Sequence, residues 1–317
     1  MNHEITIDRR SFIFKGSLVS AGLIILPALR LAAQQLSTLD VASAGSMRAM
    51  LEGPLKTSAA QALALDIHTH AQGADAVAAS LLDGSLSADV FIPITAHPMF
   101  TILRAGEASI AQPIARTELV LLYSPRSRFL RRFELAAQGK ANWWEVLQQP
   151  GLRIARSNPA LDPGGRAVIF VMMLAAKKYN QPDLVAKVLG PTINPDQIPD
   201  QISTGGNTQA RLQRGEIDVM AVYKTGPAAT GQPFIALPPD INLSSSTLRE
   251  DHPNLSLTVG SNVFYPEPLI FYAATLKNAA HPASAAAFLA WLQGKEAQAL
   301  FQQAHFDLVD DPTPLYL

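Results

Sequence analysis

The stretch TLDVASAGSMRAML, residues 38–51, contains an apolar run that ends in a turn of small residues and continues in a helix-like pattern. The same order recurs twice: the apolar run 63–70 precedes the helical pattern 74–82, and the run 88–94 precedes the pattern 99–105. Buried strands that alternate with helices are typical of parallel sheets covered by helices on both faces. The sequence therefore predicts an α/β fold.

A second set of elements follows in the middle of the chain, and the C-terminal part adds one strand and one long helix. We expect strands at 118–123, 153–156, 217–223 and 269–275, helices at 143–149, 165–179, 207–214 and 282–303, and a loop rich in Pro and Gly at 190–206. These elements predict two lobes. Residues 34–115 and 258–317 form one lobe, residues 116–257 form the other, and the chain crosses between them near 112–120 and 225–265. A cleft between two such lobes is a natural ligand site.

The composition excludes several classes of protein. The 317 residues contain no Cys, so disulfides, Cys-ligated metal sites and thiol nucleophiles are ruled out. The 25 Lys and Arg residues are balanced by 26 Asp and Glu residues, which argues against a nucleic-acid partner. The chain has no G-x-S-x-G turn, P-loop or H-E-x-x-H motif. We therefore expect no catalytic residues and no cofactor, and the chain is predicted not to be an enzyme.

The N-terminal residues 1–33 are typical of an export signal. Asp8-Arg9-Arg10-Ser11-Phe12-Ile13 is similar to a twin-arginine signal, and the apolar run 16–29 is shorter than the roughly 20 residues that span a bilayer. The alternative is an ordinary secretory signal with two arginines. Both interpretations place the mature protein in the periplasm, and an uncut signal would anchor it to the membrane.

Four turns suit the binding of an oxyanion. They lie at 42–47, 70–74, 157–166 and 204–208, the last joined by 223–225 after the next strand. Ligands of α/β sheets bind beyond the carboxyl ends of strands, where helix N-termini offer unpaired N–H groups. Each turn alone is more often only a helix cap. Two turns belong to each lobe, however, so together they predict an anion site in the cleft.

The sequence resembles the periplasmic molybdate/tungstate-binding proteins of ABC transporters, within the type II solute-binding superfamily. The resemblance rests on VASAGSM (41–47), NWWEVLQQPGLRIARSNPALDPGGRA (142–167) and GEIDVMAVYKT (215–225), among other segments. It implies a two-lobed type II periplasmic-binding-protein fold with mostly parallel sheets, capture of molybdate or tungstate in the cleft, and delivery to a membrane permease. We expect a monomer.

The resemblance also implies roles for individual residues. Ser46 supplies a hydroxyl and a backbone N–H, while Asp162 and Gly164 lie in the binding loop of the second lobe. Thr208 supplies a backbone N–H, and Tyr223 matches the anion-binding tyrosine of the family.

Two departures from the family pattern bear on the ligand. The family commonly has Ser in the second turn, where this chain has Gly73 and Ala74, so only a backbone N–H is expected there. The tungstate branch places a carboxylate beside the tyrosine, but the neighbours of Tyr223 are Val222 and Lys224. Tetrahedral binding of the oxyanion is therefore expected rather than expanded metal coordination.

Several alternatives stay open at this level. Arg166 could hold two anion oxygens with its planar fork, or it could be a solvated residue that pairs with Asp162. The ligand could be sulfate or phosphate. Asp66, His68 and His70 alternate along an expected strand and share one face, so the histidines could bind a divalent metal in a solute-binding protein or in a metal-dependent hydrolase.

Overall fold

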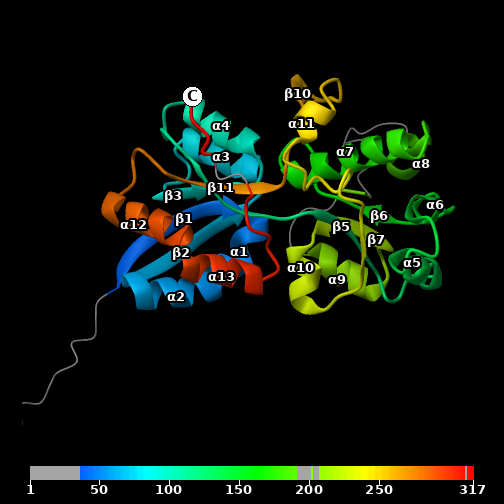
Figure 1. Ribbon diagram of the computed structural model, residues 1–317, viewed down its shortest axis with the longest axis horizontal. Coiled ribbons are helices and arrows are strands. Elements are labelled where there is room, and N and C mark those ends of the chain that lie inside the picture. Colours follow the sequence, from blue (N-terminus) through cyan, green and yellow to red (C-terminus); the bar gives the residue numbers. More distant parts are fainter. Residues whose placement is uncertain (1–35, 191–200, 203–206, 311–312) are drawn as a thin grey trace, which may run out of the picture. The chain divides into compact units, whose positions relative to one another are not determined.

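Two β-sheets, each covered by helices, organise the chain in the computed structural model, which describes residues 36–190, 201–202, 207–310 and 313–317 (Figure 1). Both sheets lie within one compact unit, Gln35–Leu317. The expected export signal at 1–33 and most of the expected loop at 190–206 lie outside the described residues. Within the described residues, no helix is both long and apolar enough to cross a membrane.

The first sheet has five strands in the order β2-β1-β3-β11-β4. The central strand β1 runs parallel to β2 and β3, whereas β11 runs antiparallel to β3 and β4. The strands are β1 (Ser37–Ala44), β2 (Leu65–Gln72), β3 (Val90–Ile92), β4 (Gln112–Arg116) and β11 (Ile270–Thr275). The short helix η1 (Gly45–Met47) follows β1, and the α-helices of this first lobe are α1 (Arg48–Glu52), α2 (Pro54–Leu63), α3 (Ala74–Leu82), α4 (Ala96–Arg104), α12 (Pro282–Leu292) and α13 (Lys295–Gln303).

Alternating side chains of β1 bury two faces of this sheet. Leu39 and Val41 belong to a core cluster with Leu55 of α2, whereas Ala42 belongs to a second cluster with Val77 of α3. This is the two-residue period of a strand buried on both sides. Figure 1 shows the corresponding layers, with α3 and α4 on one side of the sheet and α2 and α13 on the other.

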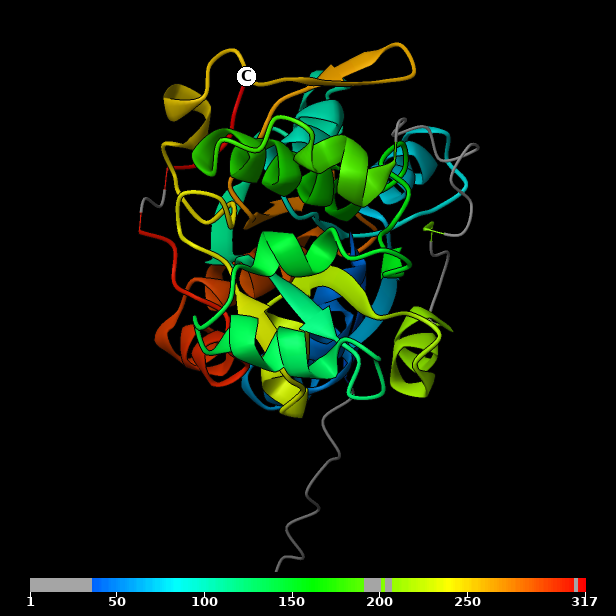
Figure 2. The same cartoon turned by 90° about the vertical axis from the view of Figure 1, so that its right-hand side faces the viewer.

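The second sheet has four strands in the order β6-β7-β5-β8. β7 is parallel to β6, and β5 is antiparallel to β7 and β8. The strands are β5 (Leu119–Tyr123), β6 (Ile154–Ala155), β7 (Val219–Tyr223) and β8 (Phe234–Ala236). This second lobe also holds α5 (Leu130–Ala137), α6 (Trp143–Leu147), α7 (Pro163–Lys178), α8 (Leu184–Leu189), α9 (Asn207–Arg214) and α10 (Thr225–Thr230). In Figure 2, α7 lies on one side of this sheet and α10 on the other.

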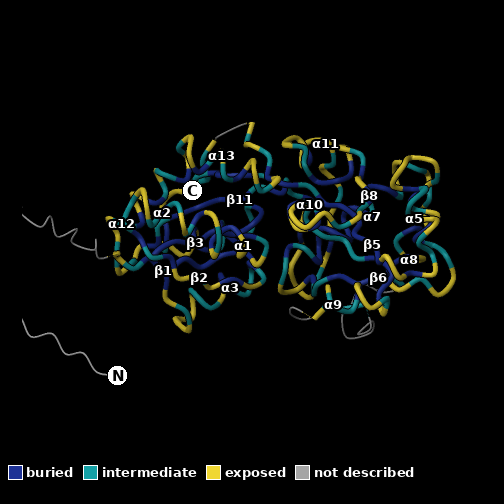
Figure 3. Tube along the Cα trace, turned by 90° about the horizontal axis from the view of Figure 1, so that it is seen from below, coloured by how far each residue is buried: buried dark blue, intermediate teal, exposed yellow. Residues whose placement is uncertain are grey.

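The helix α7 is a largely buried helix of the second lobe. Asp162 caps its first turn and Pro163 occupies its first position, a combination that favours helix initiation. Most of its side chains are buried, including Phe170 and Met172. Figure 3 shows the same contrast throughout, with buried strands inside both lobes and exposed segments in the connecting loops.

The remaining elements lead back to the first lobe. They are the helix α11 (Leu248–Asp251) and an antiparallel hairpin of β9 (Leu257–Val259) and β10 (Asn262–Phe264).

The predicted α/β class with mostly parallel sheets is confirmed, and each sheet is mixed because one of its strands runs against the others. β11 and β5 are the antiparallel strands, and each joins its sheet directly after a segment in which the chain passes between the sheets. A strand that enters a sheet from the far side need not follow the direction that strand-helix-strand units impose.

Two expected helices are each divided in two. The helical pattern that follows β1 is expected to run over 47–62, but the helix breaks at Gly53, because Pro54 lacks the N–H that would continue its hydrogen-bonding pattern. The C-terminal helix breaks at Gln293 and Gly294.

Candidate functional site

A cavity of about 470 Å³ opens between the loops of the two lobes. All four turns proposed from the sequence contribute to its wall. The lining residues are Ala44, Gly45, Ser46, Gln72, Gly73, Ile94, Leu119, Arg156, Ser157, Asp162, Gly164, Thr208, Gln209, Met220, Ala221, Val222 and Tyr223. The wall therefore brings together residues at or just after the carboxyl ends of β1, β2, β6 and β7.

Two hydroxyl groups in this wall have no hydrogen-bond partner among the described residues. They are Ser46 Oγ, in the short helix η1 that follows β1, and Tyr223 OH, at the end of β7, and both oxygens are buried. Desolvation raises the pKa of Tyr223 well above its usual value, so its phenol keeps its proton and can donate it. Buried polar atoms usually have partners, so this pair marks a place where a ligand can supply acceptors.

Arg156 also lines the cavity, although the sequence argument did not propose it as a site residue. It directly follows the short strand β6, and its side chain is 2% exposed. All three guanidinium nitrogens are buried without a hydrogen-bond partner among the described residues. Burial lowers the pKa of Arg156 to about 10, so the group is still charged at neutral pH.

The neighbouring Arg153 explains why Arg156 was overlooked. Both arginines lie in the strand expected at 153–156, and Arg153 Nε binds Asp218 Oδ2 at 2.9 Å. Only the three-dimensional packing distinguishes the paired arginine from the unpaired one. The one available signal was a cation placed at the carboxyl end of an expected strand.

The loop before α7 brings Asp162 and Gly164 to the cavity, although their polar groups are partly used within the loop. Asp162 Oδ1 accepts the Gly164 N–H at 2.9 Å, which is the capping bond of α7. Desolvation raises the pKa of the Asp162 carboxyl. A Cβ at Gly164 would lie 3.2 Å from Tyr223 OH, so the glycine keeps the space beside that hydroxyl open. The backbone N–H of Gly164 is thus already bonded within the loop.

Gly73 and Ala74 occupy different positions relative to the cavity. Gly73 lines it, while Ala74 begins α3 and is buried in the first lobe, 1% exposed. A Cβ at Gly73 would lie 2.6 Å from the carbonyl oxygen of Leu161. The loops of the two lobes therefore touch at Gly73, at a distance that only glycine permits.

Arg166 does not line the cavity, and the structure contradicts both interpretations offered for it. Its Nη1 lies 2.6 Å from Asp75 Oδ2 in α3 and donates to the Pro159 carbonyl at 2.9 Å. The guanidinium also stacks 4.1 Å from the centre of the Phe264 ring. The residue is 4% exposed, so it is neither solvated nor ion-paired with Asp162. Its first-turn position in α7 points it at the other lobe rather than at the cleft.

Thr208 and Gln209, near the start of α9, complete the wall of the second lobe. Lys224, which follows Tyr223, is not part of the wall. Its Nζ pairs with Glu118 Oε1 at 3.1 Å. Neither chain neighbour of Tyr223 therefore offers a carboxylate to the cavity: Val222 is apolar, and Lys224 is paired with Glu118.

The histidines considered as metal ligands lie elsewhere, on β2 at the edge of the first sheet. His68 contacts Asp66 at 3.2 Å and Asp40 at 3.6 Å, and His70 lies 3.8 Å from Asp40. About half of each histidine side chain is exposed. Neither histidine lines the cavity.

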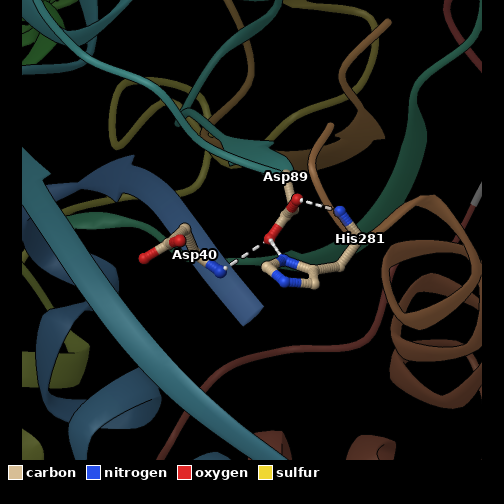
Figure 4. A group of neighbouring side chains, drawn as sticks. All are labelled: Asp40, Asp89 and His281. Carbon is tan, nitrogen blue, oxygen red and sulfur yellow. Dashed lines mark hydrogen bonds and ion pairs between the residues drawn. The ribbon is translucent and has the colours of Figure 1, made fainter. Parts of the chain in front are cut away.

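Among the described residues, one group has three ligand atoms close enough to hold a metal ion: Asp40, Asp89 and His281 (Figure 4). Asp89 is already bonded, because it accepts the backbone N–H groups of Asp40 at 2.9 Å and of His281 at 2.8 Å, and contacts the His281 ring at 3.1 Å. Figure 4 shows the Asp40 carboxylate on the far side of these bonds. The group ties β1, the start of β3 and α12 together.

Comparisons with known proteins agree with this architecture. Residues 39–307 match the family of bacterial extracellular solute-binding proteins. Over 215 residues the chain is 25% identical to a molybdate/tungstate-binding protein, WtpA, of Thermococcus kodakarensis. The matching region covers 62% of this chain and 60% of that protein. The corresponding protein of Pyrococcus abyssi is 24% identical over 215 residues, covering 62% of each.

A solved structure with the same fold is the periplasmic molybdate-binding protein of Azotobacter vinelandii. It superposes with a TM-score of 0.57 and 19% identity, covering 86% of this chain and all of that one. The chain therefore has the two-lobed type II periplasmic-binding-protein fold, with the ligand cleft between the lobes.

Proposed function

The chain belongs to the family of bacterial extracellular solute-binding proteins, and on that premise we propose that it captures a tetrahedral oxyanion, molybdate or tungstate, and delivers it to an ABC transporter permease. Under this proposal the protein performs no chemistry on its ligand. The names of the relatives in Thermococcus and Pyrococcus favour these two anions. Residues 1–33 would direct export, by the twin-arginine route, to the periplasm.

One observation carries the proposal: Ser46 Oγ and Tyr223 OH, one from each lobe, are both buried in the wall of the same cavity, and neither has a hydrogen-bond partner in the described part of the chain. An oxyanion has acceptors on all sides and would satisfy both hydroxyls at once. It would also satisfy the unpartnered guanidinium of Arg156. Hydrogen bonds to a charged group contribute roughly 1.5–3 kcal/mol each. A few of these, together with backbone N–H groups, could supply the roughly 12 kcal/mol of nanomolar binding after ordering costs.

The surroundings of Tyr223 support binding of the intact tetrahedral anion. Direct coordination of the metal atom would need carboxylates directed at the ligand. The residues beside Tyr223 offer none, since Val222 is apolar and Lys224 is paired with Glu118. Asp162 lines the cavity, but one of its oxygens is held by the Gly164 N–H.

The two-lobed division gives this site a mechanism of release. We take 34–115 with 258–317 as one lobe and 116–257 as the other, and all strands of the second sheet fall within 116–257. Crossings near 112–120 and 225–265 would act as the hinge. Binding would favour the closed form, in which both lobes face a permease together, and opening would release the anion. A monomer suffices for this cycle.

The test is calorimetric titration of the purified, anion-stripped protein with tungstate, molybdate, sulfate and phosphate in turn, with Zn²⁺ as a control. The proposal predicts submicromolar binding of tungstate or molybdate and far weaker binding of sulfate. Preferential binding of sulfate or phosphate would keep the fold and change the ligand. Binding of Zn²⁺ alone would overturn the proposal and direct attention to His68 and His70.

A further inference from the structure

Arg156 differs from every other cation near the cavity in having no counter-charge. Lys224 is paired with Glu118, Arg166 with Asp75, and Arg153 with Asp218. The three guanidinium nitrogens of Arg156 have no partner among the described residues, and desolvation alone accounts for its lowered pKa. Within the part of the chain that the structure describes, the wall of the cleft therefore holds a buried positive charge without an ion-pair partner.

A charge of this kind is costly for the unliganded protein. Burying an isolated cation without a partner costs far more than burying a neutral side chain of the same size, and proteins usually avoid it. The same charge interacts strongly with any anion that enters, because the surroundings screen it poorly. The buried charge therefore destabilises the unliganded protein, and this destabilisation is offset only when a negatively charged ligand binds.

Given the oxyanion-binding role proposed above, on which this inference rests, we propose that Arg156 is the residue that makes the site select doubly charged oxyanions over singly charged ones. Ser46 Oγ and Tyr223 OH recognise oxygen acceptors, which anions of either charge provide in the same tetrahedral arrangement. The Coulomb attraction of Arg156, by contrast, doubles when the ligand charge doubles. The two hydroxyls thus recognise the tetrahedral arrangement of the ligand's oxygens, and the guanidinium recognises the ligand's charge.

Tungstate and perrhenate provide the test, because both are tetrahedral and close in size while tungstate carries two negative charges and perrhenate one. Affinities for both are measured by calorimetry at low salt and pH 8 for the unmodified protein, for R156Q, for R156K and for R131Q. Arg131 is 77% exposed in α5, so R131Q removes one positive charge from the same lobe without touching the site.

The expected result is at least 100-fold preference for tungstate in the unmodified protein and in R131Q. In R156Q the tungstate affinity should fall about 100-fold and the perrhenate affinity about tenfold or less, so the preference shrinks at least tenfold. R156K should keep most of the preference, because it keeps the charge. An unchanged preference in R156Q, or equal affinities in the unmodified protein, would overturn the inference.

The outcomes separate this inference from the function on which it rests. Failure of the unmodified protein to bind tungstate would refute both. Tight binding of tungstate with an unchanged preference in R156Q would refute only the role of Arg156. Thermal unfolding of the unliganded proteins adds an independent readout. Removal of a costly charge should leave R156Q at least as stable as the unmodified protein, whereas a purely structural arginine would lower its melting temperature when replaced.

Discussion

Arg166 of α7 and Asp75 of α3 form an ion pair at 2.6 Å that joins the second lobe to the first. Only 5% of the Arg166 side chain and 18% of the Asp75 side chain are exposed. Phe264 covers the guanidinium, and Pro159 accepts one of its N–H groups. This pair lies outside the cavity wall, so it holds the two lobes together beside the ligand instead of touching it.

Replacing Asp75 by Asn should therefore weaken the closed form. The change leaves the Arg166 charge buried without its partner, and breaking such a pair costs about 3 kcal/mol. We expect the free energy of unfolding in urea to fall by about this amount and the affinity for tungstate to fall as well. The matched control is Asp240→Asn, which breaks the exposed pair of Asp240 with Lys178 and should cost less than about 1 kcal/mol. Equal effects of the two variants would contradict the role of the buried pair.

The contact of Gly73 with the Leu161 carbonyl should make this glycine essential for closure. An added Cβ would lie 2.6 Å from that oxygen, which belongs to backbone and cannot move aside cheaply. The Gly73→Ala variant should bind tungstate at least tenfold more weakly in titration. Gly226→Ala is the control, because a Cβ there would meet no atom within 4 Å and Gly226 does not line the cavity. Unchanged affinity in Gly73→Ala, or an equal loss in Gly226→Ala, would refute this account.

The hydroxyls of Ser46 and Tyr223 should contribute to anion binding but not to the stability of the unliganded protein. Ser46→Ala and Tyr223→Phe each remove one donor that has no protein partner among the described residues, so the unliganded protein should unfold within about 0.5 kcal/mol of the unmodified one. The tungstate dissociation constant should rise about tenfold or more for each variant, since a hydrogen bond to a charged group is lost. Unchanged affinity in both variants would show that the anion binds elsewhere.

Glu267 should make stability depend on pH. Desolvation raises its pKa to about 7, although the polar groups of Thr95 and of the His97 backbone and the charge of Arg166 oppose this shift, while the charge of Asp75 adds to it. The folded state therefore holds the Glu267 proton more tightly than the unfolded chain, in which the pKa is near 4.5. Between these two values the folded state binds more protons, so the free energy of unfolding should fall by about 3 kcal/mol as pH rises.

The Glu267→Gln variant isolates this contribution from that of His97, whose pKa is lowered by burial nearby. Urea unfolding at pH 5 and pH 8 should show a smaller fall in the variant than in the unmodified protein. Glu250→Gln, at an exposed position in α11, is the control and should keep the full fall. The same fall in all three proteins would rule out Glu267 as its source.

The sequence predicted the parts of this protein that depend on local pattern. The turns at 42–47 and 223–225 end strands whose apolar runs are clear, and the carboxyl ends of such strands are where ligands bind. The roles of Ser46 and Tyr223 within these turns were expected from the family resemblance. The break before α2 was not predicted, although Pro54 stands inside the helix expected at 47–62. The two-residue strand β6 lies inside the strand expected at 153–156, whereas β8 was not predicted, because three residues are too few for a period to be recognised.

The properties that the sequence did not predict arise between distant segments. Arg166 has its partner 91 residues away in the other lobe, and nothing near it along the chain signals Asp75. Arg156 differs from Arg153 only in what packs around it. The burial of a charge without a partner is a property of the folded molecule, so it is visible only in the structure.

The most direct test of the central claim is a crystal structure of the protein with tungstate, with anomalous scattering recorded at a tungsten absorption edge. The account predicts one strong anomalous peak in the cavity, within hydrogen-bonding reach of Ser46 Oγ, Tyr223 OH and the Arg156 guanidinium, and no peak beside His68 and His70. An ordered tungsten peak elsewhere, with this cavity empty, would contradict the account.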